Sequence, residues 1–145
     1  MIGNYDANQD FSEGGMMPGG LRPYTLTPLN RGCVETISVE FKNSDKSWVD
    51  KTDKKLYFTA KTKPWDDDTT DSDAVFKVVG VIPDPAAPGH VEFNLTEQQT
   101  YLDPKQLYFC DIVQTDADGT SNATRIFIGN FNVIGGANNA QTGGR

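Results

Sequence analysis

Positive charge is scarce in this chain. Its 145 residues carry 13 Lys and Arg against 20 Asp and Glu, which gives a net charge of −7 at pH 7. A surface of that sign repels phosphate backbones, and no basic cluster interleaved with aromatic residues offsets the repulsion. We therefore expect no nucleic acid among the partners of this protein.

Long apolar runs are also missing. The longest spans a few residues, far short of the ~20 that a membrane-crossing helix needs. Residues 1–15, MIGNYDANQDFSEGG, have neither the basic start nor the apolar core of a signal peptide. The sequence therefore predicts a protein made in the cytoplasm, with no membrane partner.

Motifs for catalysis and metal binding are absent as well. The chain contains no GxGxxG, no GxSxG, no GK[ST] and no CxxC. The single histidine, His90, is expected at the start of a strand rather than in a metal site. The acidic run 66–73 lacks the DxDxDG spacing of a calcium loop, so a solvated loop is favoured there over a calcium site. We expect no enzyme, no bound metal and no cofactor.

Cysteine is limited to Cys33 and Cys110, each in a strand-like run. Immunoglobulin domains join two such positions by a disulfide between their sheets. Nothing in the sequence indicates export, so we expect two buried, reduced thiols. Whether the two sulfur atoms meet stays open.

What the chain does have is alternation of polar and apolar residues, which predicts strands with one buried face. In CVETISVEF, the inward positions Cys33, Ile37, Val39 and Phe41 alternate with mostly polar ones, and Glu35 is the exception on that face, near the start of the strand. The strand-like runs lie at 24–29, 33–41, 56–63, 74–82, 90–95, 106–115 and 124–134. The inward positions expected in the later runs are Leu56, Phe58, Ala60, Val91, Phe93, Leu95, Tyr108, Cys110, Ile112, Phe127, Phe131 and Val133.

Turn signals separate these runs. Pro28 confines the first run to a sheet edge, because proline has no N–H to donate. Thr96 and Gln99 form a capping-box pattern that predicts one helical turn over 97–102. The DADG sequence at 116–119 predicts a tight hairpin.

About seven short strands with regular turns and no long helix predict an all-β fold. We expect a single antiparallel β-sandwich of the immunoglobulin-like type over residues 24–134. Residues 1–23 are expected to form an extended arm, and residues 135–145 a flexible tail rich in Gly and Asn.

The arm combines two Gly-Gly pairs and two prolines, which resist packing into a core, with well-spaced apolar residues. It is either a disordered tail or an extended segment that lies on a neighbouring subunit. In the second case its anchors are Ile2, Tyr5, Phe11, Met16, Met17 and Leu21.

Two tryptophans, Trp48 and Trp65, flank two successive loops. Exposed indoles stack on sugar rings, so these two are candidate ligand-stacking residues. Anchoring in the core is the commoner fate of a Trp beside a strand.

The second half of the chain has a particular order of motifs. Five elements follow one another: Leu95-Thr96, a turn at 100–102, a strand at 108–112, Asp118-Gly119 and a strand at 129–133. In this order residues 89–134 resemble the small immunoglobulin-like domains of tailed-phage virions, such as the N-terminal domain of phage baseplate upper proteins. Residues 33–134 resemble them more loosely.

The resemblance implies a non-enzymatic bacteriophage structural protein located in the virion, either a capsid decoration protein or an adaptor subunit of the neck, tail or baseplate. Its partners would be other virion proteins, namely capsid, neck, tail or fibre subunits. It would dock on them through its arm, in many copies of a symmetric assembly. The alternative is a carbohydrate or host-surface binding module that uses the loops.

Overall fold

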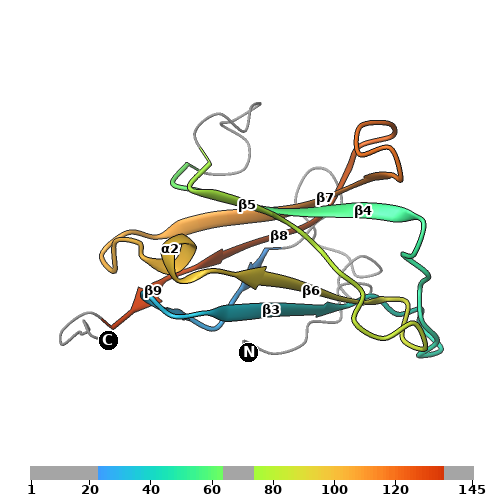
Figure 1. Ribbon diagram of the computed structural model, residues 1–145, viewed down its shortest axis with the longest axis horizontal. Coiled ribbons are helices and arrows are strands. Elements are labelled where there is room, and N and C mark those ends of the chain that lie inside the picture. Colours follow the sequence, from blue (N-terminus) through green and yellow to red (C-terminus); the bar gives the residue numbers. More distant parts are fainter. Residues whose placement is uncertain (1–22, 64–73, 136–145) are drawn as a thin grey trace.

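The computed structural model describes residues 23–63 and 74–135 (Figure 1). They form short strands and a single helical turn, so the expected all-β class is confirmed. The elements are β1 (Tyr24–Thr25), β2 (Leu29–Asn30), β3 (Glu35–Glu40), β4 (Lys54–Lys61), β5 (Phe76–Val79), β6 (His90–Leu95), α2 (Glu97–Thr100), β7 (Tyr108–Asp116), β8 (Thr124–Phe131) and β9 (Val133–Ile134).

The strands lie in two layers (Figure 1). One layer is a five-stranded sheet in the order β1-β8-β7-β4-β5, and the other contains the antiparallel pair β3-β6. The two-residue strands β2 and β9 form a third, small ladder. The ring centroids of Phe58 in β4 and Phe93 in β6 are 5.5 Å apart, so side chains from both layers share one core.

The five-stranded sheet is mixed and the small ladder is parallel, so the expectation of an antiparallel arrangement throughout is wrong. β1 runs parallel to β8, and β2 runs parallel to β9. The expected single strand at 24–29 is also divided in two. Leu26 N donates to Asn130 O at 2.9 Å and Leu29 N donates to Asn132 O at 3.0 Å, while Pro28 between them has no N–H and interrupts the series.

The alternation predicted the inward faces of the long strands correctly. Glu35 begins β3, as expected, and its buried carboxylate accepts hydrogen bonds from Asn30 N at 2.9 Å and Asn30 Nδ2 at 2.7 Å. The predicted inward residues that are buried are Ile37, Val39, Phe41, Leu56, Phe58, Ala60, Val91, Phe93, Leu95, Tyr108, Cys110, Ile112, Phe127, Phe131 and Val133.

Both predicted turns are present, although the helical turn ends at Thr100 rather than at residue 102. The Thr96 hydroxyl accepts a hydrogen bond from Gln99 N, and the Gln99 side chain accepts one from Thr96 N, which is a complete capping box. At the β7–β8 hairpin, Gly119 has φ +83°, a left-handed conformation that favours glycine. The carboxylate of Asp118 accepts hydrogen bonds from Ser121 and Thr120, which lower its pKa to about 2.

The prediction of two buried thiols is half wrong. Cys110 in β7 is buried, and this burial raises the pKa of its thiol well above the usual value. Cys33 is exposed, because the chain turns at Gly32 (φ +74°) and β3 begins only at Glu35. The two cysteines form no disulfide.

Candidate functional site

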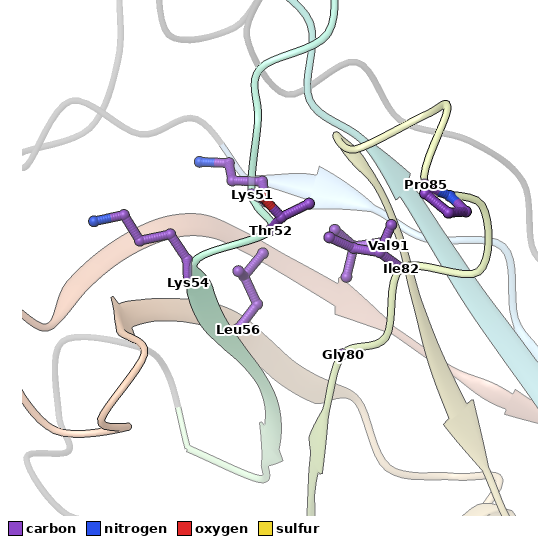
Figure 2. Close-up of a pocket in the computed structure, with 8 residues that line it drawn as sticks. All are labelled: Lys51, Thr52, Lys54, Leu56, Gly80, Ile82, Pro85 and Val91. Carbon is purple, nitrogen blue, oxygen red and sulfur yellow. The ribbon is translucent and has the colours of Figure 1, made fainter.

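A pocket of about 320 Å³ opens beside the place where the chain passes from one layer to the other (Figure 2). After β5, Gly80 N still donates to Leu56 O at 2.8 Å, within the five-stranded layer. The next residue, Val81, already pairs with Glu92 of β6 in the other layer. The pocket is lined by Lys51, Thr52, Lys54, Leu56, Gly80, Ile82, Pro85 and Val91.

Glycine at position 80 is what lets the crossing segment lie so close to β6. A Cβ atom there would lie 2.5 Å from Val91 Cγ1 and 2.8 Å from Phe93 Cε1, both well inside van der Waals contact. Any larger residue would push the crossing segment away from β6. The inner wall of the pocket therefore depends on this one glycine.

A short turn holds the lysine side of the pocket in place. The Asp50 carboxylate accepts hydrogen bonds from Thr52 N at 2.9 Å and Thr52 Oγ1 at 2.6 Å, and these bonds lower its pKa. Lys51 N donates to Pro88 O at 3.0 Å, which ties the turn to the loop before β6. Lys54 N donates to Lys51 O at 3.1 Å and leads into β4.

The two lysines line the pocket with their methylene stems. Their ammonium groups point to the same side, away from the wall formed by Ile82 and Pro85 (Figure 2). Lys51 Nζ donates to Gln114 Oε1 at 2.6 Å and lies 4.9 Å from the centroid of the Phe41 ring. Polar and apolar groups therefore line the pocket together, with the two lysines on one side.

The ionisation of the two lysines differs. Burial lowers the pKa of Lys51, and the neighbouring Lys54 lowers it further. Lys54 Nζ pairs with Asp116 Oδ1 at 3.0 Å, and this hydrogen bond raises the pKa of Lys54. Lys51 is thus the cation whose charge the protein compensates less well.

Trp48, one of the two predicted stacking residues, is half-buried. It forms an isolated bridge with Lys42, and Lys42 Nζ lies 4.6 Å from the ring centroid. A Cβ on Gly89 would lie 3.0 Å from Trp48 Cε3, so the edge of the indole packs closely on the chain before β6. These contacts make Trp48 an anchor of its loop, with a cation over its ring. Trp65 lies outside the described residues.

The predicted arm anchors also lie outside the described residues: Ile2, Tyr5, Phe11, Met16, Met17 and Leu21. The same holds for the acidic run 66–73.

His90 begins β6, as the sequence predicts, and lies between two carboxylates. Its ring nitrogens are 3.6 Å from Glu40 Oε2 and 3.4 Å from Glu92 Oε2. Across residues 23–63 and 74–135, no group of three or more His, Cys, Asp or Glu side chains is arranged to hold a metal ion.

Sequence reasoning did not find the pocket. Lys51 and Lys54 lie between the strand-like runs at 33–41 and 56–63, and nothing in that stretch indicated that they line a pocket. The only local signal was Gly80 inside a strand-like run, since a glycine in a strand often marks a close approach of two chain segments.

No model of a known protein family matches this chain, and no curated protein is significantly similar to it. In the part of the chain that the structure describes, no helix has the length and apolar character to span a membrane.

Proposed function

We propose that the described domain is an immunoglobulin-like sandwich. In that fold one sheet contains strands C, F and G, which an additional strand can extend, and the other sheet contains strands B and E. The sheet β8-β7-β4-β5 corresponds to G, F, C and C′, and the pair β3-β6 corresponds to B and E. This strand order, together with the motif order of residues 89–134, supports the likeness to tailed-phage virion domains.

We propose further that the protein is a non-enzymatic virion structural protein that docks on neighbouring virion subunits through residues 1–23. The observation that carries this proposal is the position of β1. Tyr24 and Thr25 pair with Gly129 and Asn130 at one edge of the five-stranded sheet, and Pro23 before them is exposed. The arm therefore leaves the domain at a sheet edge, where its main chain and apolar anchors can engage a neighbour.

Truncation tests the proposal. Deletion of residues 1–20 should leave a folded domain, because the core of the described domain draws on residues 26–133. The truncated protein should keep its circular dichroism spectrum and its unfolding midpoint. It should no longer co-purify with particles when the corresponding phage assembles in its presence. Undiminished incorporation would refute the arm hypothesis.

The second candidate, a glycan- or host-surface-binding module, has weaker support. It needs an indole with a free face, and Lys42 lies over the ring of Trp48. Acrylamide quenching of tryptophan fluorescence, with and without added oligosaccharide, tests it. Protection of Trp48 or Trp65 from quenching by a sugar would favour this candidate over the structural one.

A further inference from the structure

We propose that His90, Glu40, Glu92 and Ser38 form a pH-sensitive switch on the outer face of the β3-β6 layer (Figure 1). When His90 carries a proton on both ring nitrogens, its ring bridges the two carboxylates and the Ser38 hydroxyl is left unpaired. When His90 loses one of these protons, Glu92 turns to accept a hydrogen bond from Ser38. The structure shows the first of the two arrangements.

The register of β3 and β6 brings these four side chains to one face. His90 lies directly opposite Glu40, and Glu92 lies directly opposite Ser38. Successive side chains of a strand alternate between its two faces, and both chain neighbours of Ser38 are buried in the core. The four side chains therefore share the face of the layer that points away from the core.

The surroundings of the imidazole favour a proton on each ring nitrogen. His90 Nδ1 lies 3.6 Å from Glu40 Oε2, and Nε2 lies 3.4 Å from Glu92 Oε2. A neutral imidazole has a single N–H, so one of its nitrogens would turn a lone pair towards a carboxylate, whereas an imidazolium faces both with an N–H. The three side chains are between 17% and 24% exposed, so water and salt screen these contacts only partly.

The other charged groups around His90 have partners of their own. Lys42 Nζ lies 3.6 Å from Glu40 Oε1 and offsets part of that charge. The loops that flank this end of β6 contribute Asp45 and Asp84, and each of these carboxylates accepts a hydrogen bond from a main-chain N–H two residues further along its own loop. Among the described residues, the two carboxylates of the switch are therefore the acids that face the ring.

Ser38 supplies the second arrangement. Its side chain is fully buried, and in the part of the chain that the structure describes its hydroxyl has no hydrogen-bond partner. A buried polar group without a partner is rare in folded proteins and needs a reason. A partner that the hydroxyl gains only in a second state is such a reason.

Glu92 is within reach of that hydroxyl. Its main-chain N–H and C=O both pair with Val81, at 2.8 Å in each direction, so Glu92 and Ser38 form the non-hydrogen-bonded type of antiparallel pair. Side chains lie closest in pairs of this type, whose Cα atoms are ~4.5 Å apart. The carboxylate of Glu92 can therefore turn from the ring of His90 to the hydroxyl of Ser38 without a movement of the main chain.

The switch changes both the link between the strands and the charge of the outer face. Histidine is the side chain that ordinarily changes its charge between pH 5 and pH 8. With His90 protonated, the ring ties β6 to Glu40 of β3. With His90 neutral, the bond from Ser38 to Glu92 ties the strands together instead, and the face carries one more negative charge.

Urea unfolding of full-length Ser38→Ala at two pH values tests the switch. At pH 8, where Ser38 binds Glu92, the variant should have an unfolding equilibrium constant about tenfold larger than that of the unmodified protein, because a hydrogen bond to a charged group is lost. At pH 5.5, where the hydroxyl is unpaired, the variant should be no less stable. A loss of stability that does not grow from pH 5.5 to pH 8 would overturn the proposal.

Thr36→Ala is the matched control on the same face of β3. The Thr36 hydroxyl donates to Asn94 Oδ1 at 2.9 Å, and the side chain of Asn94 does not titrate. The loss of stability in this variant should therefore be the same at both pH values. A pH dependence as large as that of Ser38→Ala would contradict a switch centred on Ser38.

The role of His90 can be tested separately, because it is the only histidine in the chain. The ¹⁵N resonances of its ring should show both nitrogens protonated in the low-pH form, and the side-chain carboxyl resonance of Glu92 should change with the same midpoint. In a His90→Gln background, the effect of Ser38→Ala should no longer depend on pH. A pH dependence that survives this substitution would assign the switch to another group.

Discussion

The two edges of the five-stranded sheet, β1 and β5, differ in how far side chains cover them. At the β1 edge, Tyr24 stacks on Phe127 of β8, with ring centroids 5.2 Å apart. Leu26 and Leu29, which follow β1, are buried in the core. The first described residues therefore close this edge with apolar side chains and parallel hydrogen bonds.

The β5 edge is open by comparison. Val79 and Val81 are 48% and 46% exposed, and the chain crosses between the layers at Gly80 with the pocket beside it. A closed edge stabilises the fold, whereas the open edge leaves these two valine side chains about half exposed. Substitutions at the two edges should therefore differ in their effect on stability.

The largest loss of stability is expected from a substitution at the closed β1 edge. Phe127→Ala removes a fully buried ring and its stacking partner for Tyr24, so it should lower the free energy of unfolding by about 3–5 kcal/mol. Val79→Ala on the open edge is the control and should change it by less than ~0.5 kcal/mol. Urea unfolding of both variants measures the contrast, and equal losses would remove the distinction between the edges.

A smaller loss of stability is expected at Gly80, where the crossing segment lies closest to β6. Gly80→Ala places a methyl group against Val91 and Phe93, which should cost about 1–3 kcal/mol of stability. In a double-mutant cycle, the same change made in a Val91→Ala background should cost less, because the nearest clashing atom is gone. Additive effects would show that Gly80 is not in contact with β6.

A third prediction concerns the β7–β8 hairpin, which belongs to neither edge and serves as a reference. The pKa of Asp118 is lowered to about 2, below the ~3.9 of an unperturbed Asp. Its carboxylate therefore contributes stability that is present above the unfolded pKa and is lost as the pH falls through about 2. Asp118→Asn should lower the melting temperature at pH 6, and the difference from the unmodified protein should vanish towards pH 2. A constant difference over this range would argue against the hydrogen-bonded carboxylate.

The features that could be predicted from the sequence are those set by neighbouring residues. Period-two alternation marked Ile37, Phe58 and Ile112 as core, because a strand with one buried face leaves that signature in a few consecutive residues. The capping box at Thr96 and the hairpin at Gly119 are equally local. Each was predicted from neighbours in the chain and is confirmed.

What was missed depends on residues far apart in the sequence. The parallel pairing of Leu29 with Val133 joins the two ends of the described domain, and no local pattern encodes the direction of such a pair. Likewise, the pocket exists because Lys51 and Pro85, from separate loops, face the same gap between the layers. Cys33 was assigned to the strand because the alternating pattern was extended back to it. In the structure the chain turns at Gly32, and β3 begins only at Glu35.

The smallest predicted effect concerns the two lysines that line the pocket, and it tests whether the open edge carries an uncompensated charge. Lys51 should titrate below the ordinary lysine value and Lys54 above it, because burial disfavours the first cation and Asp116 stabilises the second. The side-chain carbon resonances of both lysines, followed by NMR from pH 8 to pH 12, give the order directly. Asp116→Asn should lower the pKa of Lys54 towards that of Lys51 and serves as the matched variant.

The sign of the Lys51 shift links this titration to stability. A lysine whose pKa falls on folding opposes folding while it is charged, and this cost is lost as the pH rises from the folded pKa to the higher unfolded pKa. Lys51 should therefore oppose folding at neutral pH, whereas Lys54, paired with Asp116, should favour it.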